Sequence, residues 1–338
     1  MPLLDGHDPS ALKQAARRIA DGGLVAFPTE TVYGLGARAD DDAAVAGIFA
    51  AKGRPADHPL IVHLAEAAAA EDFAAAISPG ARRLMARFWP GPLTLILPRR
   101  AGRAGAAAAG QASIGLRLPS HPIARALLRE CAALGVAGVA APSANRFGRV
   151  SPTRAGHVTQ EFGPDLLVLE GGACEVGIES AIVDCSRDEP ALLRPGGIDR
   201  GLLEAALGRP LAAPDAASPR APGTLEAHYA PEARVLLLDA AALQAALAGP
   251  LPPGLAVYSR LVPAARAGMA HRTMPDDAAA TAHELFAVLR EFDAGGASLI
   301  WVEKPPARPS WDGVRDRLQR AAAAAGPTGT ARRSASEH

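Results

Sequence analysis

The chain has 338 residues, of which 49% are hydrophobic and 21% are charged. This length exceeds what one average core buries and therefore predicts two domains. Lysine plus arginine and aspartate plus glutamate each total 35, so the formal net charge is zero and a strongly basic nucleic-acid-binding protein is not indicated.

Cysteine usage and the first residues of the sequence indicate the compartment. The three cysteines, Cys131, Cys174 and Cys185, form no Cys-x-x-Cys pair, which disfavours a cysteine zinc site and is typical of a reducing compartment. The sequence does not open on a basic segment followed by a long apolar run, and it contains no stretch of about 18 apolar residues. We therefore expect a cytoplasmic protein without a membrane-spanning segment.

The first part of the chain mixes predicted strands and helices. Asp8 caps a helix that stops at Gly22-Gly23, and an apolar run over 24–27 then predicts a buried strand. The carboxylates of 40–42 open a second helix, which ends near Lys52. Further strands are expected over 60–64, 93–97, 114–118, 138–141, 166–169 and 181–184, and further helices over 82–88 and 123–134. This irregular order predicts an α/β domain with a mixed sheet over residues 1–206.

The composition changes over residues 207–232, which are rich in proline, alanine and glycine and are interpreted as a linker. After the linker, strands are expected over 234–239, 255–259 and 298–302, alternating with helices over 240–248, 277–292 and 311–323. Such alternation predicts a small parallel sheet in a second α/β domain over residues 233–325. The polar tail over 326–338 is expected to be disordered.

Two cations one residue apart mark a candidate anion site. Lys52 and Arg54 flank Gly53, and a planar guanidinium and a mobile ammonium both suit phosphate oxygens. A solvated helix end, whose cations simply oppose the helix dipole, is the alternative. The polar run over 28–35 follows a strand end, where α/β sheets place ligands, although a polar turn would have the same composition.

Further polar residues lie in or beside predicted strands. Ser143 and Asn145 follow an apolar strand and either bind a ligand or stabilise a turn. Arg117 stands within an apolar strand and needs a partner, which is either a carboxylate such as Asp184 or Glu179, or an anionic ligand. Ser113, Ser180 and Arg194 occupy similar positions.

Histidines and nucleophiles give weaker signals. His63 ends an apolar run and on its own is best interpreted as a core histidine. The histidine spacing fits no metal site on a helix, and no serine or cysteine nucleophile with a recognisable base supports covalent catalysis.

Taken together, these motifs resemble the YrdC-type threonylcarbamoyl-AMP synthases. The resemblance rests on the order and spacing of five motifs across residues 10–206: the runs 28–36, 52–55, 59–63, 143–145 and 193–196. The run 222–231 and the following domain resemble the longer, two-domain form. The resemblance implies a YrdC-like mixed twisted sheet with helices around a basic cavity, plus a smaller C-terminal Rossmann-like parallel α/β domain.

The resemblance also implies a nucleotidyltransferase. Enzymes of this family convert L-threonine, bicarbonate and ATP into L-threonylcarbamoyladenylate and pyrophosphate, the first step of the tRNA modification threonylcarbamoyladenosine, and a separate machinery completes the transfer. Magnesium is expected to arrive with ATP, without a protein-held metal or an organic cofactor. Membrane binding is not expected, and tRNA binding is compatible with the resemblance but not implied by it.

Motif by motif, the resemblance assigns roles to residues of this sequence. Lys52 and Arg54 would be catalytic and would hold the ATP phosphates. The nucleotide would also contact His58, Ser113, Ala141, Ser143, Asn145, Ser151 and Arg194, threonine would contact Thr31, His63, Arg117 and Ser180, and the linker would contact the pocket through His228 and Tyr229.

The sequence departs from the family pattern at two places, and two rival functions stay open. The linker carries Thr224-Leu225-Glu226, and Ala181 follows Ser180 where a threonine is usual. One rival is a carbamoyl-transfer maturation enzyme, but such enzymes carry Cys-x-x-Cys pairs that this sequence lacks. The other is an RNA-binding translation or ribosome factor, which neutral charge and 4% aromatic residues disfavour.

Overall fold

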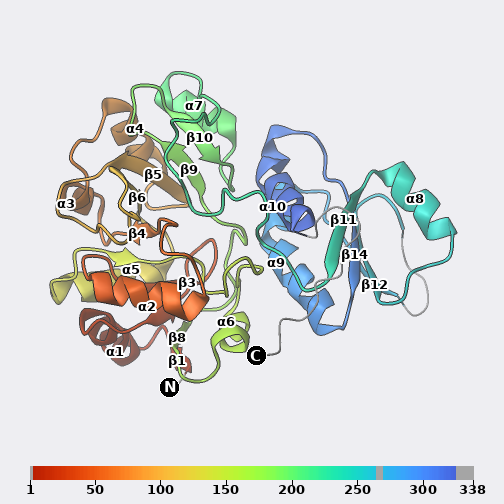
Figure 1. The fold of residues 1–338 in the computed structure, drawn as a ribbon, viewed down its shortest axis with the longest axis horizontal. Coiled ribbons are helices and arrows are strands. Elements are labelled where there is room, and N and C mark those ends of the chain that lie inside the picture. The colour runs from red at the N-terminus through yellow and green to blue at the C-terminus, as the bar shows by residue number, and fades with distance from the viewer. Residues whose placement is uncertain (1–2, 264–268, 325–338) are drawn as a thin grey trace, which may run out of the picture.

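The computed structural model describes residues 3–263 and 269–324, and Figure 1 shows two α/β bodies side by side. The tail over 326–338, expected to be disordered, lies outside the described residues. Within the described residues, no helix is both long and apolar enough to cross a bilayer.

The larger body is a mixed sheet, as expected. Its ten described strands lie in the order β1-β8-β2-β3-β7-β4-β6-β5-β9-β10, with both parallel and antiparallel neighbours. The strands are β1 (Leu3–Asp5), β2 (Val25–Phe27), β3 (Gly34–Arg38), β4 (Ile61–His63), β5 (Leu93–Pro98), β6 (Ser113–Arg117), β7 (Val139–Ala140), β8 (Leu167–Glu170), β9 (Ala181–Asp184) and β10 (Ala191–Arg194). The helices are α1 (Pro9–Ala20), α2 (Asp42–Lys52), α3 (Ala70–Phe73), α4 (Pro79–Phe88), α5 (Pro122–Ala133), α6 (Ala155–Phe162) and α7 (Arg200–Leu207).

Strand β3 is the most instructive addition to the sequence expectation, which included no strand between 24–27 and 60–64. Within β3, Gly36 pairs with Val25 of β2 inside the sheet. A Cβ on Gly36 would lie 2.7 Å from the Phe27 ring and 2.8 Å from Val139 Cγ1. The glycine is therefore needed for close packing inside a strand, not for a turn.

The smaller body is a parallel sheet, also as expected. Its four described strands lie in the order β11-β14-β12-β13. They are β11 (Arg234–Leu238), β12 (Leu255–Ser259), β13 (Ala270–Thr273) and β14 (Leu299–Glu303), and the helices are α8 (Ala240–Ala248), α9 (Ala278–Ala294) and α10 (Asp312–Ala323). Leu285 of α9 and Val314 of α10 pack on one face of the sheet, whereas Leu243 of α8 packs on the other.

The two bodies share a hydrophobic core. Val32 and Ile178, from loops of the larger body, are buried in the same cluster as Phe286 and Val314 of the smaller body. A Cβ on Gly313 of α10 would lie 2.6 Å from the backbone oxygen of Gly196, so the helix backbone packs directly on the larger body. This contact brings α10 close to the polar strand ends described next.

Candidate active site

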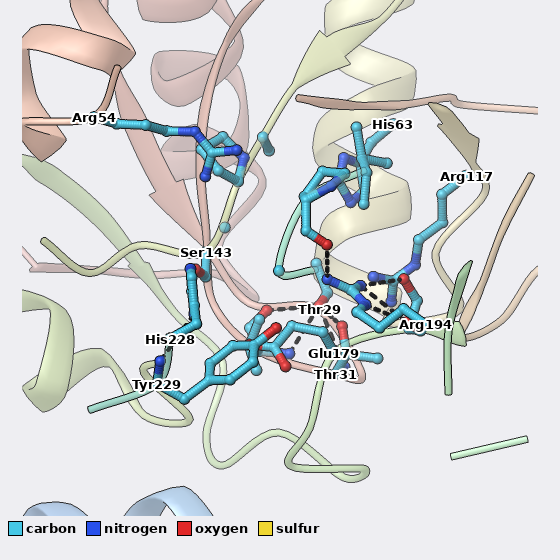
Figure 2. A pocket seen from close by; sticks show the side chains of 18 residues that line it. Thr29, Thr31, Arg54, His63, Arg117, Ser143, Glu179, Arg194, His228 and Tyr229 are labelled. Atoms are coloured by element: carbon cyan, nitrogen blue, oxygen red, sulfur yellow. Dashed lines mark hydrogen bonds between the residues drawn. The ribbon is translucent and has the colours of Figure 1, made fainter. Parts of the chain in front are cut away.

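A polar cavity lies where strand ends of the larger sheet meet the linker (Figure 2). Most residues that the sequence singles out contribute to its wall: Thr31, Arg54, His63, Arg117, Ala141, Ser143, Ser180, Arg194, His228 and Tyr229. In Figure 2, Arg54 and Arg117 lie on opposite sides of the cavity. Five motifs far apart in the sequence therefore meet in one place.

The segment after β2 is a threonine-centred turn. The Thr29 Oγ1 atom donates to the Val32 carbonyl oxygen at 2.6 Å and accepts the backbone N–H groups of Thr31 and Val32 at 3.2 Å. Thr31 is fully buried, and its Oγ1 lies 2.9 Å from that of Thr29. The turn and the ligand-site interpretations of this run are thus compatible, because the turn presents the hydroxyls to the cavity.

Lys52 is the last residue of α2 but is buried, so its interpretation as a solvated cation at a helix end is wrong. Its Nζ donates to the backbone oxygens of Ser143 and Asn145 at 2.6 and 2.5 Å. Burial, followed by the repulsion of Arg54, lowers the pKa of Lys52 well below its usual value. Lys52 does not line the cavity itself but holds the Ser143 segment in the wall.

Arg54 reaches the cavity wall from the loop after α2. One guanidinium nitrogen, Nη2, donates to the Pro59 backbone oxygen at 2.9 Å, while the buried Nε has no partner among the described residues. The pKa of Arg54 is lowered to about 10, chiefly by burial, with a smaller opposing effect of Tyr229 and a smaller lowering by Arg194. An incompletely paired buried guanidinium is suited to an anionic ligand.

Arg117 has a carboxylate partner that the sequence did not suggest. Its Nη2 lies 2.8 Å from Glu30 Oε1, and both side chains are about 5% exposed or less. The sequence named Asp184 or Glu179 as structural partners, but Asp184 pairs with Arg187 at 3.1 Å. Glu30 could have been suspected, since an acidic residue within a buried polar run needs a cation.

His63 lies beside Arg117 because β4 and β6 pair in parallel with these two residues in register. Burial, and then the positive charge of Arg117, lowers the pKa of His63 to about 3. The ring is therefore neutral at physiological pH and its Nδ1 has no partner among the described residues.

Arg194 joins the wall to the linker. Its Nε and Nη2 donate to the Ser180 backbone oxygen at 3.0 and 2.9 Å, and its Nη1 donates to the Pro222 backbone oxygen at 2.8 Å. The Ser180 hydroxyl also pairs with Thr94 at 2.8 Å. Glu179, which no sequence motif assigned to the site, lines the wall next to Ser180.

The linker covers the cavity through Pro222, Gly223, His228 and Tyr229. Tyr229 adopts a left-handed backbone with φ of 60° and stacks on Phe286 at 5.5 Å between ring centroids. The unusual linker residues Thr224, Leu225 and Glu226 do not line the cavity. The departure from the family pattern therefore leaves the contacts of His228 and Tyr229 in place.

Four expected residues stand outside the wall, besides Lys52. His58 packs on Phe147 with ring centroids 5.3 Å apart, and Phe147 in turn contacts His228. Asn145 donates to backbone oxygens of its own loop, and Ser151 donates to Glu179, so both support the wall from behind. Ser113 lines a separate, smaller cavity and is not brought to the site.

The described residues offer little for a protein-held metal. They contain no cluster of three or more histidine, cysteine, aspartate or glutamate side chains suited to a metal ion. The acidic groups nearest the cavity, Glu30 and Glu179, pair with Arg117 and Arg317. The cavity instead gathers cationic donors and hydroxyl groups.

A cavity at the strand ends of a mixed sheet that is lined by arginines and hydroxyl groups is suited to anionic small molecules, and it defines the class as an α/β protein with a small-molecule pocket. Comparison with known proteins identifies the family. Residues 17–196 match the family described as telomere recombination (Sua5, YciO and YrdC), and residues 198–323 match the threonylcarbamoyl-AMP synthase C-terminal domain. The chain belongs to the threonylcarbamoyl-AMP synthase family of enzymes, in its two-domain form.

Relatives and solved structures agree with this assignment. The threonylcarbamoyl-AMP synthase of Bacillus subtilis is 42% identical over 243 residues, which cover 70% of this chain and 68% of that protein. The Pyrococcus abyssi synthase is 43% identical over 234 residues, covering 68% of each. The structure of P. abyssi Sua5 complexed with L-threonine has a TM-score of 0.83 at 34% identity and covers 94% of this chain and 96% of that one. A P. abyssi Sua5 variant with an adjacent histidine and tyrosine changed to alanine has a TM-score of 0.82 at 34% identity, covering 94% of both chains.

Proposed function

We propose that this chain makes L-threonylcarbamoyladenylate from L-threonine, bicarbonate and ATP, with release of pyrophosphate. The observation that carries the proposal is the single cavity in which Thr31, Arg117 and Ser180 face Arg54. The names of the relatives and the threonine complex of P. abyssi Sua5 support the choice of substrates.

Threonine would occupy the side of the cavity formed by Arg117 and His63. The Arg117 guanidinium suits the threonine carboxylate, and Glu30 keeps this guanidinium oriented by the 2.8 Å ion pair. The hydroxyls of Thr31 and Ser180 would hydrogen-bond polar atoms of the amino acid. Neutral His63 adds a hydrogen-bonding ring without a second positive charge.

ATP would occupy the side formed by Arg54 and the Ser143 segment. In the proposed step, a carbamate oxygen of N-carboxylated threonine bonds to the α-phosphorus while the bond from that phosphorus to the pyrophosphate oxygen breaks. Negative charge develops on the phosphates, so a preorganised guanidinium stabilises the transition state. Lys52 donates to two backbone oxygens and so fixes the loop on this side; because it does not line the cavity, it would reach phosphate only once the cavity widens for ATP.

The other nucleotide contacts divide into direct and supporting ones. Ala141 and Arg194 line the cavity and would touch ATP directly. His58, Asn145 and Ser151 would act through Phe147, the loop and Glu179. Ser113 would meet the nucleotide only after the smaller cavity beside Pro222 joins the main one.

Magnesium would enter with ATP as a phosphate complex. Mg²⁺ usually keeps several waters and binds through phosphate oxygens with few protein ligands. This fits the residues present, because Glu30 and Glu179 are both engaged by arginines. The ion would neutralise phosphate charge, and the arginines of the wall would orient the same oxygens.

The linker would have to move for ATP to bind. The cavity measures about 50 Å³, far below the roughly 300–1,000 Å³ of sites for larger ligands. The Arg194 guanidinium donates to the Pro222 backbone oxygen at 2.8 Å, which holds this part of the linker against the cavity. We infer that the linker controls access to the site, and that the product then passes to the tRNA threonylcarbamoyl-transfer machinery in the cytoplasm.

Pyrophosphate release tests the proposal. Purified full-length protein should release pyrophosphate only when ATP, magnesium, threonine and bicarbonate are all present, and each is omitted in turn. Pyrophosphate release that does not depend on threonine would contradict the proposed function. Tight, salt-sensitive RNA binding without pyrophosphate release would favour an RNA-binding factor instead.

A further inference from the structure

The parallel sheet of the second domain contains a topological switch point. Strands β11 and β14 are parallel neighbours, with Arg234 opposite Leu299 and Leu238 opposite Glu303. The helix after β11 is α8, which packs on one face, whereas the helix after β14 is α10, which packs on the other (Figure 1). In open parallel sheets, ligands bind in the crevice outside the carboxyl ends of two such strands.

A cavity of about 390 Å³ lies at this point. Its wall comes from the end of β11 (Leu237, Asp239), the end of β14 (Glu303, Lys304) and α10 (Arg315, Leu318). Cavities of roughly 300–1,000 Å³ commonly hold small molecules. None of its lining residues belongs to the proposed catalytic cavity.

A buried carboxylate, Glu303, holds the rim of this crevice in place without a bound ligand. Glu303 is 2% exposed, and its Oε2 accepts the backbone N–H groups of Arg260, Leu261 and Val262 at 2.8, 2.8 and 3.1 Å. Ser259 Oγ donates to the Val262 backbone oxygen at 2.6 Å. The turn after β12 is thereby fixed over the crevice, and the three N–H groups compensate the Glu303 charge.

Three cations line the crevice: Arg260, Lys304 and Arg315. Each also meets a carboxylate at the surface, Asp276 at 2.6 Å, Asp239 at 3.2 Å and Asp312 at 3.4 Å, respectively. The pairs of Lys304 and Arg315 are exposed, and exposed pairs contribute about 0–1 kcal/mol, so an anionic ligand can compete for these two cations. Arg260 also carries a buried Nε without a partner among the described residues.

The first turn of α8 adds backbone donors. Asp239 occupies the N-cap position but makes no side-chain bond to the turn, and it pairs with Lys304 instead. The first N–H groups of a helix have no intrahelical acceptor, and they carry the positive end of the dipole. Ala240, the first residue of this helix, lines the crevice.

We propose that this crevice binds a small organic phosphate of about mononucleotide size, separately from the catalytic cavity. The phosphate would contact Arg260, Lys304 and the first turn of α8. The apolar part of the ligand would lie on Leu261, which is 62% exposed and lines the crevice, with buried Leu318 behind it. The second domain would thus sense a phosphorylated metabolite in addition to supporting the first.

Methyl NMR of the full-length protein tests the proposal at both cavities in one titration. The protein is labelled at leucine and valine methyl groups and titrated with AMP, without the other substrates. Leu261 and Leu318 report on the crevice, and Val32 reports on the catalytic cavity. We expect saturable shifts at Leu261 and Leu318 that persist in an Arg54→Ala variant.

Charge-removing variants provide the controls. The double variant Arg260→Gln/Lys304→Gln should weaken the response of Leu261 by about tenfold or more, with unchanged pyrophosphate release. Arg272→Gln removes a comparable surface ion pair with Glu284 outside the crevice and should leave the response intact. Shifts at Val32 alone, or non-saturating shifts that the double variant retains, would overturn the proposal. If inorganic phosphate bound as tightly as AMP, the proposal that the ligand is an organic phosphate would be wrong.

Discussion

Arg317 of α10 forms two hydrogen bonds with Glu179 of the cavity wall. Its Nε donates to Glu179 Oε2 at 2.8 Å and its Nη2 donates to the Glu179 backbone oxygen at 3.1 Å, with the arginine side chain fully buried. Burial by itself would raise the pKa of Glu179, but Arg317, Arg194 and the Ser151 hydroxyl lower it below its usual value. The second domain therefore keeps a carboxylate of the catalytic wall ionised.

Loss of Arg317 should change the pH dependence of catalysis. Without it, burial raises the pKa of Glu179, which still faces Arg194, Lys52, His228 and Tyr229, so the carboxyl protonates at a higher pH. We expect Arg317→Met to move the acid limb of the pyrophosphate-release profile upward and to cost about 3–5 kcal/mol of stability. The profile and urea denaturation check both effects.

The matched control is Arg290→Met. Arg290 makes an interdomain ion pair with Glu161 at 2.7 Å, with side chains 12% and 9% exposed, and neither residue lines the catalytic cavity. This variant should lose stability without moving the acid limb. Equal profiles for the two variants would show that Arg317 only holds the domains together.

Alanine substitutions of Lys52 and Arg54 should both lower turnover but should differ in how much stability they cost. Lys52→Ala leaves two backbone oxygens without their donor, so it should cost about 1–3 kcal/mol of stability together with most turnover. Arg54→Ala removes only one such bond, to Pro59, and should lose turnover with a smaller change in melting temperature. Calorimetry and pyrophosphate release measure the two quantities, and wild-type rates in both variants would refute the phosphate role.

His63 should stay neutral in the folded protein from about pH 5 to 8. Its pKa is lowered to about 3, whereas an unfolded histidine titrates near ~6.5. The unfolded state thus binds a proton first, and this residue makes stability fall as the pH drops below that value. Histidine ring NMR, with His63→Gln to assign the signal, should show no inflection across this range.

Gly36 should tolerate no side chain. A Cβ there meets Phe27 and Val139 below 3 Å, and overpacking of this kind costs about 1–3 kcal/mol. Gly156 of α6 has open space around its Cβ position, so Gly156→Ala should be neutral or slightly stabilising. Thermal unfolding of the two variants side by side is the measurement, and equal melting temperatures would contradict the packing argument.

Local sequence patterns predicted most of the fold and most of the residues that line the catalytic cavity. Apolar runs such as 181–184 and 255–259 became strands with those same bounds, because burial on both faces leaves a continuous signal. The short edge strands β1 and β13 and the glycine-rich β3 lacked that signal. Ser113 shares a strand face with Arg117 but lies roughly 13 Å away along it, so sharing a face did not place it in the cavity.

The residues that the sequence could not assign act over long chain distances. Glu179 and Arg317 are paired by the docking of α10 through Gly313, and no local pattern encodes that contact. Glu30 differs, since its place between Thr29 and Thr31 could have marked it as the partner of a buried cation.

The shared core couples the threonine-centred turn to the second domain. Val32 lies three residues after Thr29 and is packed with Ile178, Phe286 and Val314 in one cluster. Domains joined by a hydrophobic interface move less independently than domains joined by a polar one. The second domain therefore shields the apolar end of the threonine-centred turn from water, and its removal would expose Val32 while leaving the turn's own hydrogen bonds in place.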